Sequence, residues 1–113
     1  MKITIIGGGN IGGAIAGGLA ASTLMKASDL TVADPSAAAL ERIKGLNSAI
    51  RTSQDNAAAV EGADLIILAV KPWLAEEVSA TFRDKLDFDR QCLASVVAGV
   101  SFEKLKTMLD NGK

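Results

Sequence analysis

The residues with the clearest chemical meaning are the glycines between positions 7 and 12. The run Ile6-Gly7-Gly8-Gly9-Asn10-Ile11-Gly12 holds a GxGxxG spacing, directly after an apolar segment and directly before a helical one. In such a turn Gly7 permits the tight bend, Gly9 lets the backbone approach a pyrophosphate, and Gly12 allows close packing of helix on strand. The free N–H groups at the start of the helix bind phosphate. The pattern predicts a dinucleotide site; the alternative is a close-packed turn without a ligand.

A carboxylate at Asp34 supports the same interpretation. Asp34 closes the second apolar segment about 20 residues after Gly12, which is the spacing of an acid that accepts ribose hydroxyls. A carboxylate there favours NAD, because it repels the extra phosphate of NADP. Ser36 lies two residues further on and keeps NADP binding open. The alternative role for Asp34 is a cap for the helix that starts at Pro35.

Four further residues fall near the expected ligand edge. Lys71 and Pro72 follow an apolar strand where a nicotinamide ribose would lie, although Lys71 also fits an ordinary solvated charge. Asn56 opens a short helix and fits either a cap or a ligand contact. Trp73, the only tryptophan, is expected to pack at this rim, over the cleft or over the start of the next helix.

Composition limits the other function classes. A chain of 113 residues with a net charge of −1 and no basic run fits one domain with a small-molecule ligand, and argues against nucleic acid or a membrane surface as partner. Histidine is absent, so the commonest general base and metal ligand are missing, and no metal site is expected. The single cysteine, Cys92, is expected to be buried in a strand. Without disulfides or a signal peptide, a cytoplasmic location is expected.

Apolar patterns predict alternating strands and helices. Strands are expected at 2–6, 30–34, 49–52, 65–70 and 93–98. Helices are expected at 10–22, 35–44, 56–61, 73–85 and 102–109. Gly45 is the expected stop of the second helix, Asp55 the cap of the third and Gly62 its end.

This alternation predicts an α/β fold. Right-handed crossovers give a Rossmann-type, doubly wound parallel sheet of order 3-2-1-4-5 with helices on both faces. The uninterrupted apolar run at 65–70 is expected to be central and buried on both faces. The ligand is expected at the carboxyl ends of the first and fourth strands.

Beyond these patterns, the chain resembles the N-terminal dinucleotide-binding domain of pyrroline-5-carboxylate reductases over nearly all its length. The matching segments are the glycine turn followed by Ala14 and Gly18-Leu19, then Ala69-Val70-Lys71-Pro72, and Ser95-Val96-Val97-Ala98-Gly99-Val100-Ser101. The resemblance implies an NAD(P)H site, with hydride transfer to the C=N carbon of 1-pyrroline-5-carboxylate to give proline. It names no catalytic side chain in this domain. The cofactor-binding residues it implies are Ile6, Gly7, Gly8, Gly9, Asn10, Ile11, Gly12, Asp34, Ser36, Asn56, Ala69, Val70, Lys71, Pro72, Val97 and Ala98.

The resemblance also implies a second, helical domain that these 113 residues do not contain. In that family it forms the oligomer and most of the imine pocket, so this chain alone is expected to be mainly monomeric, to bind cofactor and not to turn over. Asp34 departs from the family's usual suitability for NADPH. Two alternatives remain: another reductase of the β-hydroxyacid dehydrogenase-like group, or a non-catalytic nucleotide-sensing module. Apolar residues of 102–109 that protrude would indicate a partner surface.

Overall fold

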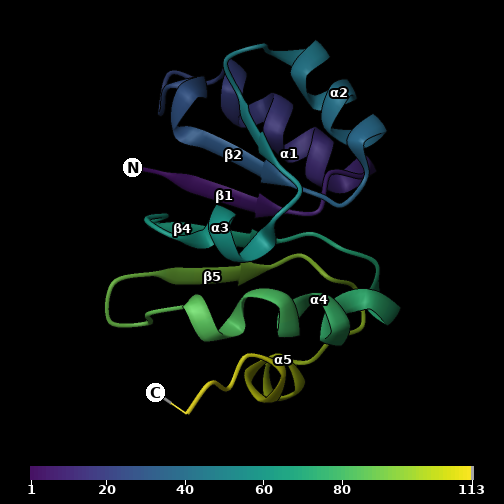
Figure 1. The fold of residues 1–113 in the computed structure, drawn as a ribbon, viewed down its shortest axis with the longest axis vertical. Coiled ribbons are helices and arrows are strands. Elements are labelled where there is room, and N and C mark those ends of the chain that lie inside the picture. The colour runs from purple at the N-terminus through teal and green to yellow at the C-terminus, as the bar shows by residue number, and fades with distance from the viewer. Residues whose placement is uncertain (113) are drawn as a thin grey trace.

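Five parallel strands form the centre of the fold. The computed structural model describes residues 1–112 and orders the strands β3-β2-β1-β4-β5 (Figure 1), which confirms the predicted doubly wound topology. Every neighbouring pair is parallel, and the arrowheads of β1, β2 and β5 point the same way in Figure 1. The strands are β1 (Ile3–Ile6), β2 (Leu30–Ala33), β3 (Arg51–Ser53), β4 (Leu65–Leu68) and β5 (Cys92–Ser95).

Helices cover both faces of this sheet. The α-helices are α1 (Asn10–Ala21), α2 (Ala37–Leu46), α3 (Asn56–Val60), α4 (Ala75–Phe82) and α5 (Phe102–Met108). Short 3₁₀ turns lie at η1 (Ala27–Asp29), η2 (Pro72–Leu74) and η3 (Arg83–Lys85). One apolar cluster joins α1 and α2 to the sheet, and a second joins it to α3, α4 and α5. Alternate residues of β1 point to opposite clusters, because successive side chains of a strand face opposite sides.

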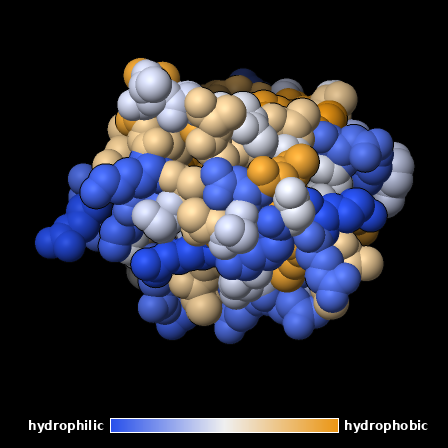
Figure 2. Space-filling view, turned by 90° about the horizontal axis from the view of Figure 1, so that it is seen from above, coloured by the Kyte–Doolittle hydropathy of each residue, from blue (hydrophilic) through white to orange (hydrophobic). Residues whose placement is uncertain are grey.

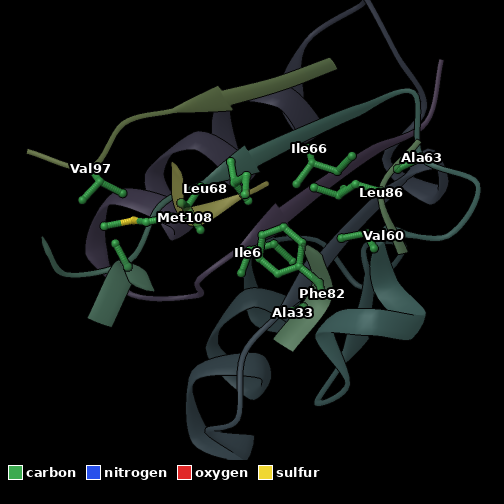
Figure 3. Packing of buried hydrophobic residues seen from close by; sticks show 12 residues of the cluster. Ile6, Ala33, Val60, Ala63, Ile66, Leu68, Phe82, Leu86, Val97 and Met108 are labelled. Carbon is green, nitrogen blue, oxygen red and sulfur yellow. The ribbon is translucent and has the colours of Figure 1, made fainter. Parts of the chain in front are cut away.

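The apolar cluster beneath α3, α4 and α5 explains the helical pattern that precedes β5. Phe82 and Leu86 are buried against Ile6, Ile66 and Val60 (Figure 3). The region expected to be a single helix, 73–85, consists instead of η2, α4 and η3. Pro72 starts a 3₁₀ turn, and at the other end the Arg83 carbonyl oxygen accepts a 3₁₀-type hydrogen bond from the Leu86 N–H, three residues later. Phe82 and Leu86, the last two residues of the predicted four-residue spacing, are therefore buried, whereas Leu74, the first of them, is exposed.

Two burial predictions were wrong for one reason. Cys92 is exposed, not buried, because β5 is the edge strand, and α1 and α2 pack over the β1 and β2 side of the sheet. Leu65 and Ile67 of β4 are only half-buried for the same reason, so the apolar run is not fully covered on both faces. The middle strand is β1, with β4 beside it.

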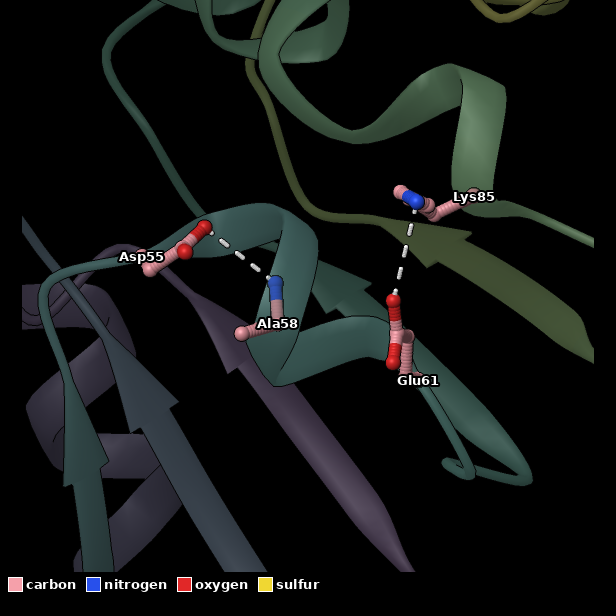
Figure 4. Close-up of polar contacts among 4 residues, drawn as sticks. All are labelled: Asp55, Ala58, Glu61 and Lys85. Atoms are coloured by element: carbon pink, nitrogen blue, oxygen red, sulfur yellow. Dashed lines mark hydrogen bonds and ion pairs between the residues drawn. The ribbon is translucent and has the colours of Figure 1, made fainter.

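Most helix boundaries follow local chemistry. Asp55 caps α3 as predicted, its carboxylate accepting the Ala58 N–H at 3.2 Å (Figure 4), and Gly62 follows with a φ of +77°. Gly45 does not stop α2, which continues to Leu46. Lys85 and Glu61 form an exposed ion pair of 3.9 Å between η3 and the end of α3 (Figure 4), and such a pair contributes little to stability.

The surface mixes polar and apolar residues. On the face seen in Figure 2, hydrophobic side chains stand in small groups among hydrophilic ones. Among residues 1–112, the helices are too short or too polar to cross a lipid bilayer.

Candidate functional site

The glycine turn is shaped by contacts that no side chain would allow. Gly7 has a φ of +113°, and a Cβ there would collide with the Ala69 carbonyl oxygen. Its N–H donates to Ala33 O at 2.8 Å, so the turn is held between the ends of β2 and β4. A Cβ on Gly12 would collide with the Gly7 carbonyl oxygen, which confirms the expected close packing of α1 on this turn.

The close approach of Gly12 to the Gly7 carbonyl oxygen predicts the effect of a substitution on stability. Gly12→Ala is expected to lower the free energy of unfolding by about 2 to 3 kcal/mol, because backbone must move to admit the methyl group. Gly13→Ala is the control, since its Cβ would meet only the Ile43 side chain at an ordinary 3.5 Å. Urea unfolding measures both variants. Equal stability of Gly12→Ala and wild type would contradict the account of the turn.

Gly9 differs from these two glycines, because the space around it is open. It is the N-cap of α1 with a φ of −76°, and a Cβ there would have no atom within 4 Å. No side chain caps α1, whereas Ser36, Asp55 and Ser101 cap α2, α3 and α5. The beginning of α1 thus combines open space with uncapped N–H groups, an arrangement that accommodates a phosphate group.

Asp34 lies beside this turn and braces it. One carboxylate oxygen accepts the Gly8 N–H at 2.8 Å, and the other accepts the Ser36 N–H at 2.8 Å. Asp34 is therefore not the cap of α2; that role belongs to the Ser36 hydroxyl, which accepts from the Ala39 N–H at 3.2 Å. Because a carboxylate has about four lone-pair positions, Asp34 can still accept hydroxyl groups from a ligand.

Asn56 stands on the β3 side of Asp34. The Asp34 N–H donates to Ser53 O at 3.0 Å, which joins the ends of β2 and β3, and Asn56 begins α3 three residues later. Its amide nitrogen donates to the Thr81 hydroxyl at 3.0 Å, whereas its amide oxygen is buried and has no hydrogen-bond partner among residues 1–112. No pattern in the sequence pointed to Thr81, because its contact with Asn56 depends on α3 packing against α4.

The end of β4 lies at the same edge of the sheet, on the side of β1 away from β2. The Ala69 N–H donates to Ile6 O at 2.9 Å, and Lys71 is exposed just before the turn that Pro72 begins. Trp73 is 76% exposed, so the expected packing at the rim is wrong for this structure. Beyond β5, Ala98 is exposed but the Val97 side chain is in the core, which leaves only its backbone for a ligand.

The structure therefore brings the predicted residues to one edge of the sheet. The turn residues Gly7, Gly8 and Gly9 follow β1, and Asn10, Ile11 and Gly12 form the first turn of α1 beside them. Asp34, Ala69 and Val70 follow the strands on either side. This edge matches the position at which doubly wound sheets bind ligands.

Comparison with known proteins agrees with this geometry. The family described as "NADP oxidoreductase coenzyme F420-dependent" matches residues 2–99. The chain belongs to this family. A pyrroline-5-carboxylate reductase from Pasteurella multocida is 36% identical over 99% of the chain and 41% of its own length. The resemblance predicted from the motifs is thus confirmed, and the chain spans about two fifths of the curated relatives it matches.

Solved structures agree in fold. A pyrroline-5-carboxylate reductase from Coxiella burnetii superposes with a TM-score of 0.86 at 30% identity, over 96% of this chain and 39% of its own. A pyrroline carboxylate reductase from Plasmodium falciparum, solved with NADP bound, gives 0.82 at 26% identity, over 100% of this chain and 39% of its own.

Proposed function

We propose that this chain binds NAD(P)H at the carboxyl edge of β1 and β4 and is the cofactor-binding part of a pyrroline-5-carboxylate reductase. The observation that carries the proposal is the start of α1, where open space at Gly9 meets uncapped N–H groups. The names of the relatives and the NADP bound to one of them support the choice of ligand.

The residues have distinct roles in this proposal. The first turn of α1 holds the pyrophosphate, while Asp34 keeps the Gly8 segment in place and accepts ribose hydroxyls. Lys71, Pro72 and the backbone at Val97 border the nicotinamide end. When bound, the cofactor supplies the hydride for the C=N bond of 1-pyrroline-5-carboxylate. We assign no catalytic side chain to this chain.

We further propose that the imine is held by a second, helical domain of the whole protein. Phe102 of α5 is 77% exposed, while Met108 and Leu109 are buried. Phe102, Phe88, Leu93 and Leu105 line an open cavity of about 530 Å³. The sequence criterion of protruding apolar residues therefore favours a partner surface over a self-sufficient module. The monomeric state of the isolated chain, the oligomer of the whole protein and the cytoplasmic location stay predictions.

Cofactor choice tests the proposed site. NADH is expected to bind wild type at least as tightly as NADPH, because Asp34 repels the extra phosphate. Asp34→Ser is expected to shift the ratio of the two Kd values toward NADPH by about tenfold, or about 1.4 kcal/mol. Calorimetric titration of both cofactors gives the four Kd values needed.

Asp29→Ser is the matched control, since it removes the same charge from η1 and leaves the Gly8 brace intact. Its ratio is expected to equal that of wild type. A wild-type preference for NADPH above about tenfold would contradict the role of Asp34. Failure of wild type to bind either cofactor would contradict the proposed function itself.

A further inference from the structure

The loop that carries Asp34 is hydrogen-bonded on two sides. On one side, Asp34 Oδ2 accepts the Gly8 N–H at 2.8 Å, which joins the loop to the glycine turn. On the other side, Gln54 Nε2 donates to Pro35 O at 2.9 Å. Gln54 directly follows β3, whose last residue, Ser53, accepts the Asp34 N–H through its carbonyl oxygen. The Gln54 side chain therefore extends the contact between β2 and β3 into the loop that follows β2.

The bond from Gln54 meets a stiff segment of backbone. A carbonyl oxygen accepts and does not donate, so the amide nitrogen of Gln54 must be the atom that faces Pro35 O. The proline ring holds φ of Pro35 at about −65°, and the residue before a proline is confined to extended backbone. That residue is Asp34. Because both residues are restricted, the position of the Pro35 carbonyl group sets the position of the Asp34 carboxylate.

The Asp34 carboxylate is open to a ligand. Asp34 is only half-buried, Pro35 and Ser36 are exposed, and a Cβ on Gly9 in the neighbouring turn would have no atom within 4 Å. Each carboxylate oxygen accepts one N–H, which leaves further lone-pair positions for ribose hydroxyls. A hydrogen bond weakens steeply when its geometry is lost, so the affinity for the ribose depends on how firmly this loop is held.

We infer that Gln54 is a positioning residue for the adenosine ribose of the dinucleotide. It holds the Asp34 carboxylate where that group accepts the ribose 2′-hydroxyl, and it acts through Pro35 O without touching the ligand. The inference rests on the proposed function. Neither the glycine pattern nor the family resemblance pointed to Gln54, because its partner lies 19 positions away in the sequence.

A cycle of one protein change and one ligand change tests this role. Gln54→Met removes the donor at nearly constant shape, and an NADH analogue without the 2′-hydroxyl on its adenosine ribose removes the group that Asp34 accepts. The Kd of NADH is expected to rise about three- to fivefold in Gln54→Met, within the range of one hydrogen bond, while the Kd of the analogue changes by less than about 1.5-fold. Calorimetric titration gives each Kd.

Asn47→Leu is the matched control. It removes another exposed amide at nearly constant shape, one whose oxygen accepts the Ala49 N–H at 3.0 Å at the opposite end of α2 from the loop. Its Kd values for NADH and for the analogue are expected to equal those of wild type. The Tm of Gln54→Met is expected to match that of Asn47→Leu, so that a change confined to NADH reports positioning and not stability.

The outcomes separate the inference from the proposed function. An unchanged Kd of NADH in Gln54→Met, or an equal rise for NADH and the analogue, would overturn the inference and leave the cofactor site standing. Equal affinity of wild type for NADH and the analogue would overturn it too, because Asp34 would then not accept the 2′-hydroxyl. Absence of NADH binding to wild type would overturn inference and function together.

Discussion

A mixture of this chain, NADH and 1-pyrroline-5-carboxylate is expected to consume NADH no faster than the same mixture without protein. Hydride transfer needs donor and acceptor carbons at near-attack distance, and fixing both reactants gives effective molarities of about 10⁵ M or more. The proposed site fixes only the cofactor. The chain contains no histidine, and the carboxylate nearest the turn, Asp34, is committed to two backbone N–H groups.

The complementary experiment adds the part of a relative that this chain does not cover. The remaining three fifths of the Pasteurella multocida reductase, fused to this chain or added in trans, are expected to bring turnover to an enzymatic rate at a few millimolar imine. Loss of NADH absorbance measures both arms, with the added part alone as control. Robust turnover by the 113-residue chain alone would contradict the account and indicate a minimal reductase.

Gly9→Val is expected to weaken NADH binding by about 100-fold or more, equal to about 2.7 kcal/mol, while the protein stays folded. The fold tolerates this change because the backbone at Gly9 is extended and nothing lies within 4 Å of a Cβ there. The same open space is what the pyrophosphate requires, so the valine side chain displaces the ligand. Quenching of Trp73 fluorescence or calorimetry gives the Kd.

Gly18→Val is the control for that variant. It places the same side chain on α1, again with no atom within 4 Å of the new Cβ, but two turns from the start of the helix. Its NADH affinity is expected to match wild type. If Gly9→Val is folded and binds NADH as tightly as Gly18→Val, the pyrophosphate does not lie at this turn.

The glycine turn and the sheet order were predictable because their causes are local. The glycines at position 7, in the strand-to-helix bend, and at position 12, in the first turn of α1, follow from steric limits that any such turn imposes. Alternation of apolar segments then restricts the topology, since parallel crossovers are right-handed. Asp55 and Gly62 are likewise recognised by side-chain type alone.

What the sequence missed depends on neighbours distant in the chain. Cys92 is exposed because β5 lies beyond the reach of α1, and apolar character alone does not reveal which strand is at the edge. The bond from Asn56 to Thr81 spans 25 positions and exists only because α3 and α4 pack together. Asp34 was expected to bind a ligand or to cap a helix. Its hydrogen bond from the Gly8 N–H was not predicted, because it depends on the three-dimensional arrangement of the turn.

We propose that the dinucleotide lies on the turn between β1 and α1. Titration of NADH into the nitrogen-15-labelled chain tests it most directly, because each backbone amide reports its own surroundings. Saturable shifts are expected at Gly8 to Gly12, at Asp34 and at Ala69 to Lys71, with little change in α5. Shifts concentrated around Phe102 and Leu105, or no saturable shift at the turn, would contradict it.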